Sequence, residues 1–228
     1  MSMISDNLSK VKAQIDAACE EFARSPHAVQ LLAVSKTFPA QAVREAYAAG
    51  QRAFGENYIQ EGVEKTLALA DLPGIEWHMI GPIQSNKTRL VAEYFQWVHS
   101  VDRLKIAQRL SEQRPAHLPP LQVCLQVNID GGANKSGCRP QEALQLACEM
   151  AGLPRLQLRG LMVIPESAPD FIASCAAFMP AKILFDQINQ AVGGMDTLSM
   201  GMSADLRAAV KAGSTMVRVG TAIFGSRG

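Results

Sequence analysis

The stretch QLLAVSKT at residues 30–37 places a run of apolar residues directly before a serine, a lysine and a threonine. A short apolar run of this kind is typical of a strand that is buried on both faces of a parallel sheet. A helical pattern follows at 40–49, and the next apolar run begins at residue 53. From residue 30 onwards the chain therefore alternates between short strands and helices.

Eight such strands are predicted, and seven helical patterns lie between them. The strands cover 30–37, 53–58, 76–81, 97–102, 121–129, 157–165, 197–203 and 216–220, and the helices cover 40–49, 59–70, 86–94, 103–113, 140–151, 172–192 and 204–212. Strands that alternate with helices form a parallel sheet, and eight units in 228 residues predict a single (β/α)8 TIM barrel. An open doubly wound sheet is the alternative, but no GxGxxG motif follows the first strand.

Residues 3–24 precede the first strand and have the apolar periodicity of an amphipathic helix. Ser5 or Asp6 is predicted to cap its start, and Pro26 marks its end. We expect this N-terminal helix, within residues 1–25, to pack on the barrel. One domain is then predicted to cover residues 1–228.

Composition excludes several classes of protein. The net charge is +1, with 48% hydrophobic and 19% charged residues, which excludes a strongly basic nucleic-acid footprint, a polybasic membrane surface and global disorder. No stretch approaches the roughly 20 apolar residues that a membrane span needs. The five cysteines form no CxxC pair, and their odd number fits a disulfide framework poorly. We expect a soluble protein in a reducing compartment, the cytoplasm.

The polar residues at the ends of the predicted strands are the candidates for a site, because barrels bind ligands there. Lys36 ends the first strand and would lie at the mouth of the barrel. Partial desolvation at such a position lowers a lysine pKa and makes its amine a nucleophile towards aldehydes. A solvated lysine at a strand end is the alternative.

The loops after strands 7 and 8 are where barrels commonly hold a phosphate group. Ser203 precedes a helical run and is predicted to be its N-cap. Gly220 would allow close approach of a phosphate to the backbone, and Thr221 supplies a hydroxyl. An ordinary helix cap and a turn glycine would give the same pattern.

Arg218 lies on the last strand and either faces a ligand or pairs with Glu56 or Asp102. An amine that reacts with aldehydes, a phosphate cup and a nearby cation together describe a pocket for pyridoxal 5′-phosphate. His78 is interpreted as a buried, hydrogen-bonded histidine, and Lys135 as part of a solvated loop that could bind an anion. The four histidines show no metal-ligand spacing with the cysteines, so no metal is expected.

Several longer motifs carry a resemblance to a known family. They are LLAVSKT with Lys36, FGENYIQE at 54–61, WHMIGPIQSNK at 77–87, NKSG at 134–137, LSMGMSADL at 198–206 and VRVGTAIFG at 217–225. In this order the chain resembles the pyridoxal phosphate homeostasis proteins, the YggS/PROSC family. The motifs span nearly the whole chain.

The resemblance implies a barrel similar to the N-terminal domain of alanine racemase, with pyridoxal phosphate held on Lys36 as an internal aldimine. It implies a phosphate cup from Ser203, Gly220 and Thr221, and an Arg218 that faces the pyridine nitrogen and keeps it unprotonated. Asn57 and His78 fall on family motifs that line the pocket. The stretch 165–182 is less regular than is usual in the family.

Three functions remain open at this point. The first is a non-catalytic carrier that buffers the cofactor and delivers it to apo-enzymes, as a monomer with no catalytic residue. The second is a pyridoxal-phosphate-dependent amino-acid racemase or decarboxylase. A racemase needs two opposed acid/base groups and only Lys36 is clearly available, and the second domain of alanine racemases is not expected here, so the carrier is favoured. The third is a barrel isomerase that binds phosphate without a cofactor. A second cofactor site near Lys135 is also left open.

Overall fold

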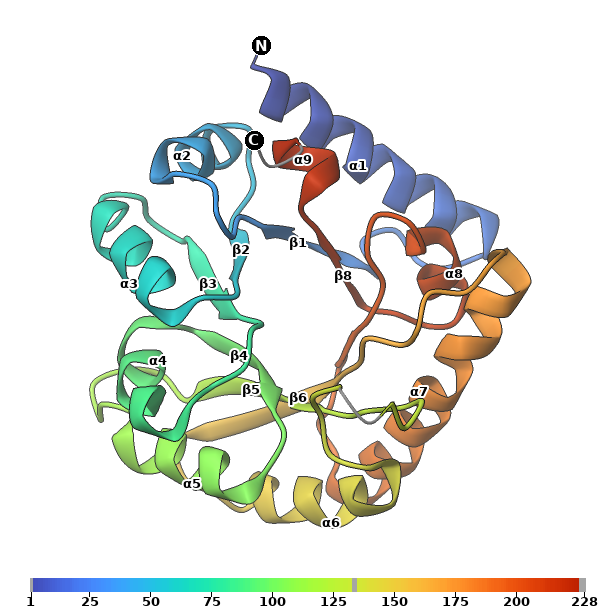
Figure 1. Cartoon of the computed structure of the whole chain (residues 1–228). Helices are drawn as coiled ribbons and strands as arrows, with labels where there is room; N and C mark the ends of the chain where they lie inside the picture. Colours follow the sequence, from blue (N-terminus) through green and yellow to red (C-terminus); the bar gives the residue numbers. More distant parts are fainter. Residues whose placement is uncertain (1, 133–134, 226–228) are drawn as a thin grey trace.

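The computed structural model describes residues 2–132 and 135–225. Its centre is a closed barrel of parallel strands in sequence order, in which the last strand pairs with the first (Figure 1). The strands are β1 (Gln30–Val34), β2 (Ala53–Glu56), β3 (Glu76–Met79), β4 (Trp97–Val101), β5 (Leu121–Gln126), β6 (Leu156–Met162), β7 (Thr197–Ser199) and β8 (Met216–Val219). The prediction of a (β/α)8 barrel is confirmed.

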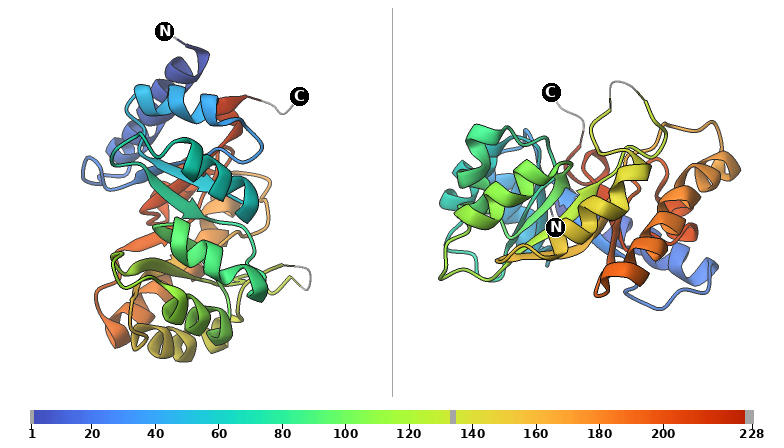
Figure 2. Two further views of the ribbon diagram at one scale, coloured as in Figure 1. Left: turned by 90° about the vertical axis from the view of Figure 1, so that its left-hand side faces the viewer. Right: turned by 90° about the horizontal axis from the view of Figure 1, so that it is seen from below.

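Helices form a ring outside the barrel (Figures 1 and 2). In chain order they are α1 (Met3–Glu21), α2 (Ala40–Ala48), α3 (Ile59–Ala68), the 3₁₀ turn η1 (Ser85–Lys87), α4 (Thr88–Tyr94), α5 (Leu104–Gln113), α6 (Pro140–Ala151), α7 (Phe171–Val192), α8 (Leu206–Lys211) and α9 (Thr221–Phe224). The seven helices predicted after the first strand agree with these to within two residues at either end, and the start of 86–94 is the 3₁₀ turn η1; the N-terminal helix predicted over 3–24 ends earlier, at Glu21.

The N-terminal helix α1 packs against α8 and α9 on the outside of the barrel. Leu8, Val11 and Ile15 form its buried stripe, because side chains three and four residues apart share one helix face. The predicted caps Ser5 and Asp6 are wrong. The helix starts one turn earlier, where the side chain of Ser2 accepts a hydrogen bond from the Ser5 N–H at 3.3 Å.

Helix α7 corrects two expectations. Among the described residues, α7 is the one helix that is long and apolar enough to cross a membrane. The expectation that no stretch approaches the length and apolar content of a membrane span is therefore corrected. Its buried side chains, Phe178, Ala181, Phe185 and Ile188, follow helical spacing along one face. The irregularity predicted for 165–182 is confined to the segment before Phe171, and the helix continues through Pro180.

Side chains on each strand alternate between the helix layer and the barrel interior. Outward-facing residues such as Ala33 and Phe54 join the large core beneath the helices. Trp97, Cys124 and Met162 form a separate buried cluster inside the barrel. The barrel interior also contains buried polar side chains. They are His78 on β3, His99 on β4, Ser199 on β7 and Arg218 on β8.

Candidate functional site

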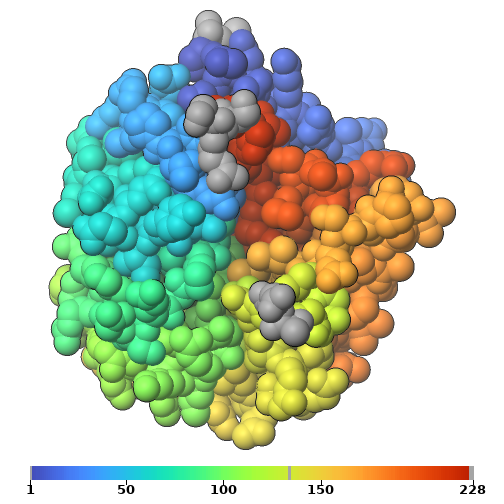
Figure 3. Space-filling view, viewed as in Figure 1, coloured from blue at the N-terminus to red at the C-terminus, as the bar shows by residue number. Residues whose placement is uncertain are grey.

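Strand register brings two of the predicted site residues, Lys36 and Asn57, to one end of the barrel. Leu32 on β1 is opposite Arg218 on β8, and Val34 is opposite Gly55 on β2. Lys36 and Asn57 each follow two residues after Val34 and Gly55, so both lie at the C-terminal ends of neighbouring strands. Figure 3 shows this end of the molecule, where segments from the first to the last part of the sequence meet around the centre.

The backbone on both sides of Lys36 is held by charged side chains. The carbonyl oxygen of Ser35 accepts a hydrogen bond from Lys65 Nζ at 2.7 Å, and Ser35 Oγ donates to Glu56 Oε1 at 2.6 Å. On the other side, the Thr37 N–H donates to Glu61 Oε1 at 2.6 Å. Thr37 has a φ of 67°, which is uncommon for a β-branched residue and costs energy. The half-buried Lys36 is thus presented from a clamped, strained turn.

Lys65, Glu56 and Glu61 form a buried ionic cluster behind this turn, named here the Lys65 cluster. Lys65 Nζ lies 2.8 Å from Glu56 Oε1 and 2.6 Å from Glu61 Oε1, and its side chain is 6% exposed. Burial raises the pKa of Glu56, although the Lys65 charge opposes this rise. Glu56 Oε2 has no hydrogen-bond partner among the described residues. The cluster holds Lys65 behind the turn that presents Lys36.

Asn57 is held in place by a close contact with Gly81. A Cβ atom added at Gly81 would lie 2.0 Å from the backbone oxygen of Asn57, so only glycine fits at this position. The carbonyl oxygen of Gly81 accepts a hydrogen bond from Ser100 Oγ at 2.6 Å. The end of β2 is therefore fixed by the loop that follows β3.

Arg218 is buried inside the barrel, with 5% of its surface exposed. Its Nη1 donates to the backbone oxygen and to Oγ of Ser199, both at 2.8 Å, and its Nη2 donates to the backbone oxygen of Val163 at 3.0 Å. Burial lowers the pKa of Arg218 to about 10, so it remains a cation at neutral pH. The guanidinium thus offers a fixed positive charge and fixed donors.

The predicted ion pair of Arg218 with Glu56 or Asp102 is wrong. Glu56 pairs with Lys65, and Asp102 pairs with Arg103 at 2.7 Å. The acceptors of Arg218 are uncharged oxygens on β7 and the loop after β6, which sequence spacing alone could not identify.

His78 is 1% exposed and lies on β3 inside the barrel. Its Nδ1 lies 3.0 Å from Nε2 of His99 on β4, and His99 Nδ1 lies 2.9 Å from Ser199 Oγ. The interpretation of His78 as a buried, hydrogen-bonded histidine is confirmed. His99 and Ser199 were missed as site residues, although the period of two along their strands would have placed both on the inner face.

The proposed phosphate loops lie at the same end. Gly220 directly follows β8, and a Cβ there would lie 3.0 Å from the Val34 backbone oxygen on β1, so a side chain is disfavoured. Thr221 begins α9 and is exposed, as is Ser203. Ser203 is not the helix cap that was predicted. Helix α8 begins later, at Leu206, and the cap position belongs to Asp205, whose Oδ1 accepts from the Met202 N–H at 2.6 Å.

Lys135 follows β5, across the barrel from β1. Its Nζ lies 2.5 Å from Asp130 Oδ2, so it forms an ion pair on the surface. Asn134 of the NKSG motif falls outside the described residues. Within residues 2–132 and 135–225, no group of three histidine, cysteine or acidic side chains could hold a metal ion.

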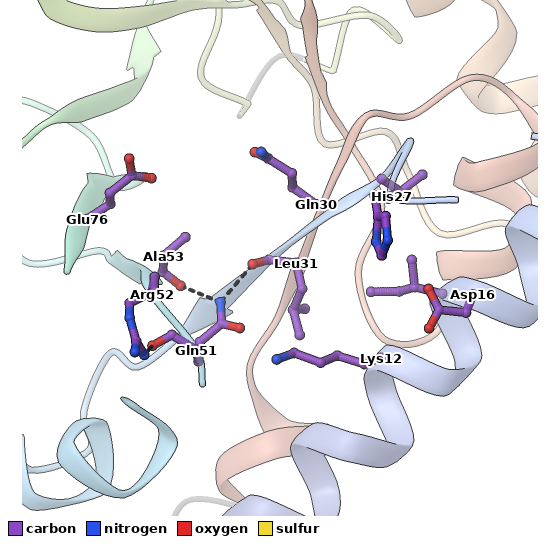
Figure 4. A pocket seen from close by; sticks show the side chains of 11 residues that line it. Lys12, Asp16, His27, Gln30, Leu31, Gln51, Arg52, Ala53 and Glu76 are labelled. Carbon is purple, nitrogen blue, oxygen red and sulfur yellow. Dashed lines mark hydrogen bonds between the residues drawn. The ribbon is translucent and has the colours of Figure 1, made fainter. Parts of the chain in front are cut away.

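At the opposite, N-terminal end of the barrel lies a cavity of about 500 Å³ (Figure 4). Its lining includes Lys12 of α1, Gln51 and Arg52, which precede β2, and Glu76, which begins β3. None of the predicted cofactor residues lines it. The site residues and this cavity are separated by the interior of the barrel.

Comparison with known proteins identifies the family. The alanine racemase N-terminal domain model matches residues 7–228. The pyridoxal phosphate homeostasis protein of Pseudomonas aeruginosa is 61% identical and covers all of this chain and 97% of its own length. That of Escherichia coli (strain K12) is 52% identical, with all of this chain and 98% of the relative covered.

Solved structures of the same family share the fold of this chain. PipY of Synechococcus elongatus PCC7942 without PLP is 40% identical, with a TM-score of 0.87 over 97% of this chain and all of its own. The same protein with PLP bound gives a TM-score of 0.84 at 38% identity over the same shares. Alanine racemase of Corynebacterium glutamicum is 19% identical, with a TM-score of 0.65 over 97% of this chain and 60% of its own, and shares the fold. The chain belongs to the pyridoxal phosphate homeostasis protein family.

Proposed function

We propose that the protein binds pyridoxal 5′-phosphate, buffers its free concentration and delivers it to apo-enzymes, without catalysing a reaction of its own. It would do so as a monomer in the cytoplasm. The observation that carries this proposal is that a lysine at a strand end and a buried cation in the barrel interior lie on neighbouring strands. A strand-end lysine, Lys36, lies one strand away from the buried cation Arg218. The PLP-bound structure of PipY, a relative of known fold, supports the choice of cofactor.

The residues present fit the cofactor. A pyridine ring nitrogen is an acceptor, and Arg218 can act only as a donor and stays charged. A phosphate group needs hydroxyl and N–H donors, which Ser203, Thr221 and the first turn of α9 offer. When bound, pyridoxal phosphate supplies an aldehyde that condenses reversibly with a primary amine and releases one water.

Each side chain then has a separate task. Lys36 offers the amine from a turn that Lys65 and Glu61 hold in place. Arg218 would orient the ring, and because a guanidinium can only donate, it would leave the ring nitrogen unprotonated. Such a ring withdraws electrons less strongly than one paired with a carboxylate, which disfavours carbanion chemistry and supports a carrier over a racemase or decarboxylase.

The first test is the visible absorption spectrum of the protein mixed with pyridoxal phosphate, followed by borohydride reduction and peptide mapping. We expect a yellow protein whose reduced adduct lies on Lys36. Lys36→Ala should remain folded and bind the cofactor far more weakly, whereas Lys10→Ala, a control on the exposed face of α1, should behave as wild type. An adduct on another lysine, or a colourless protein, would overturn the assignment.

A second test separates the carrier from an enzyme. The loaded protein is incubated with individual amino acids, and racemisation and decarboxylation are followed by chiral chromatography and release of carbon dioxide. A carrier gives no turnover but restores activity to a pyridoxal-phosphate-dependent apo-enzyme. Turnover that disappears in Lys36→Ala would instead establish the racemase or decarboxylase alternative.

A further inference from the structure

A single line of polar side chains crosses the interior of the barrel. His78, His99, Ser199 and Arg218 come from β3, β4, β7 and β8, and each is at most 5% exposed. The interior of such barrels is usually filled by branched apolar side chains. Buried polar groups are costly unless they are hydrogen-bonded, so a connected line of four calls for an explanation.

The direction of each hydrogen bond in this line follows from Arg218. A guanidinium can only donate, so Ser199 Oγ accepts from Arg218 Nη1 at 2.8 Å. The Ser199 hydroxyl proton is then available for His99 Nδ1 at 2.9 Å. With that proton donated to it, His99 accepts at Nδ1, and a neutral imidazole that accepts at one nitrogen carries its proton on the other. His99 Nε2 therefore donates to His78 Nδ1 at 3.0 Å.

The same rule fixes the far end of the line. His78 accepts at Nδ1, so its proton lies on Nε2, which has no hydrogen-bond partner among the described residues. The nearest charge is Glu76 Oε2, at 3.8 Å. Glu76 is half exposed and lines the cavity at the N-terminal end of the barrel, where Figure 4 shows its carboxylate. The negative charge of Glu76 favours a proton on His78 Nε2, and therefore hydrogen bonds that run from Arg218 towards His78.

Electrostatics keep both histidines neutral, as the directions require. Burial lowers the pKa of His78, although Glu76 opposes this. Burial, together with the charge that His78 carries when protonated and the charge of Arg218, lowers the pKa of His99 well below its ordinary value. The ring of His78 also stacks on Trp97, with centroids 5.2 Å apart. The charged or titratable groups that face the line are Glu76, Arg159 over the Trp97 ring, Asp196, Cys124, Asp205 and Arg218 itself.

We propose that His78, His99 and Ser199 are positioning residues that form a one-way hydrogen-bond line from Arg218 to His78, whose Nε2 faces the carboxylate of Glu76 at 3.8 Å. The line fixes the guanidinium for the bound cofactor and connects the cofactor site to the opposite end of the barrel. It rests on the proposed function only in that Arg218 faces the cofactor ring. The direction of the hydrogen bonds is a property of the protein without cofactor.

The first measurement is a long-range ¹H–¹⁵N spectrum of the cofactor-free protein labelled with ¹⁵N-histidine. His78 and His99 should both carry the proton on Nε2, and because burial lowers both pKa values, both should stay neutral between about pH 6.5 and pH 8. A proton on Nδ1 of His99, or titration of either buried histidine in this range, would overturn the proposal. Neither result depends on cofactor binding.

Variants then test the effect on Arg218. Ser199→Ala removes the link at Oγ but leaves the two backbone acceptors of Arg218 in place. We expect cofactor affinity to fall by on the order of tenfold. The absorption of the bound cofactor should also acquire a changed pH profile. His99→Phe should have the same effect, and His99→Gln, which keeps one acceptor and one donor, should restore part of it.

His117→Gln serves as the matched control on the surface and should leave affinity and spectrum unchanged. Circular dichroism and the melting temperature confirm that each variant is folded. Folded Ser199→Ala and His99→Phe proteins with wild-type affinity and pH profile would refute a positioning role. A wild-type protein that binds no pyridoxal phosphate would instead refute the proposed function and leave the NMR result standing.

Discussion

Replacing Lys65 by methionine should destabilise the protein strongly, because it leaves the Glu56 carboxylate buried without its cation. Glu56 is fully buried and retains only Ser35 Oγ as a hydrogen-bond donor after the change. Breaking one side of a buried ion pair typically costs about 3–5 kcal/mol. In a chain of this size each kcal/mol lowers the melting temperature by about 2–4 °C, so a decrease of about 10 °C is expected.

The double variant Lys65→Met/Glu56→Gln separates the ion pair from packing. Glutamine keeps an acceptor for Ser35 Oγ but carries no charge, so the double variant should recover most of the lost stability. The assay is urea unfolding followed by circular dichroism, with Lys10→Met as the surface control. A double variant as unstable as Lys65→Met alone would show that the lysine acts through its packing.

The pH dependence gives a second, independent check. Loss of the Lys65 charge raises the pKa of Glu56 further above its unfolded value, so the folded state binds the extra proton. A raised folded pKa stabilises the protein below the unfolded pKa, and this stability is lost as pH rises through the folded value. The deficit of Lys65→Met against wild type should therefore grow from pH 5 to pH 8. A deficit below about 1 kcal/mol, or one independent of pH, would refute the reasoning.

Three further predictions concern the site and the thiols. Thr37→Gly should raise the free energy of unfolding by about 1 kcal/mol in a urea titration, because glycine adopts the φ of 67° without strain; a loss of stability would mean that the turn is not strained. Gly81→Ala should weaken cofactor binding and lower the melting temperature, since its Cβ would lie 2.0 Å from the Asn57 oxygen; unchanged affinity would separate Asn57 from the site. Native protein should react with a thiol reagent first at the exposed Cys148, whereas Cys124, whose pKa burial raises to about 12, should react only on unfolding; early labelling of Cys124 in peptide maps would contradict its burial.

The barrel could be predicted from sequence because its signal is local and repeated. Each strand is a short apolar run, each helix has a 3.6-residue period, and the alternation alone selects a parallel sheet. Helix caps were less predictable, as Ser2 and Ser203 show. A serine before a helical pattern signals a cap, but which residue caps depends on where the loop backbone turns, and at α8 Asp205 takes that position.

The candidate cofactor residues were predicted from strand positions and motifs, whereas the residues that contact them were missed. Lys36 and Arg218 stand out as charged residues at or near strand ends. Their support comes from Lys65, His99 and Ser199, which lie on other elements and meet them only after the barrel closes. The period of two places His99 and Ser199 on the inner face but does not show which residues they contact, and a lysine on a helix is usually solvated. Long-range register decides their role.

The pairing of β1 with β8 has a consequence for how the protein is made. Lys36 leaves the ribosome early, and Arg218 follows only when the last strand has been synthesised. The barrel cannot close before then, because its first and last strands are neighbours and every other strand must already be in place. Closure through contacts so distant in sequence is slow. On the proposed function, a nascent chain without β8 has no complete binding site, and retention of the cofactor would report that the barrel has closed.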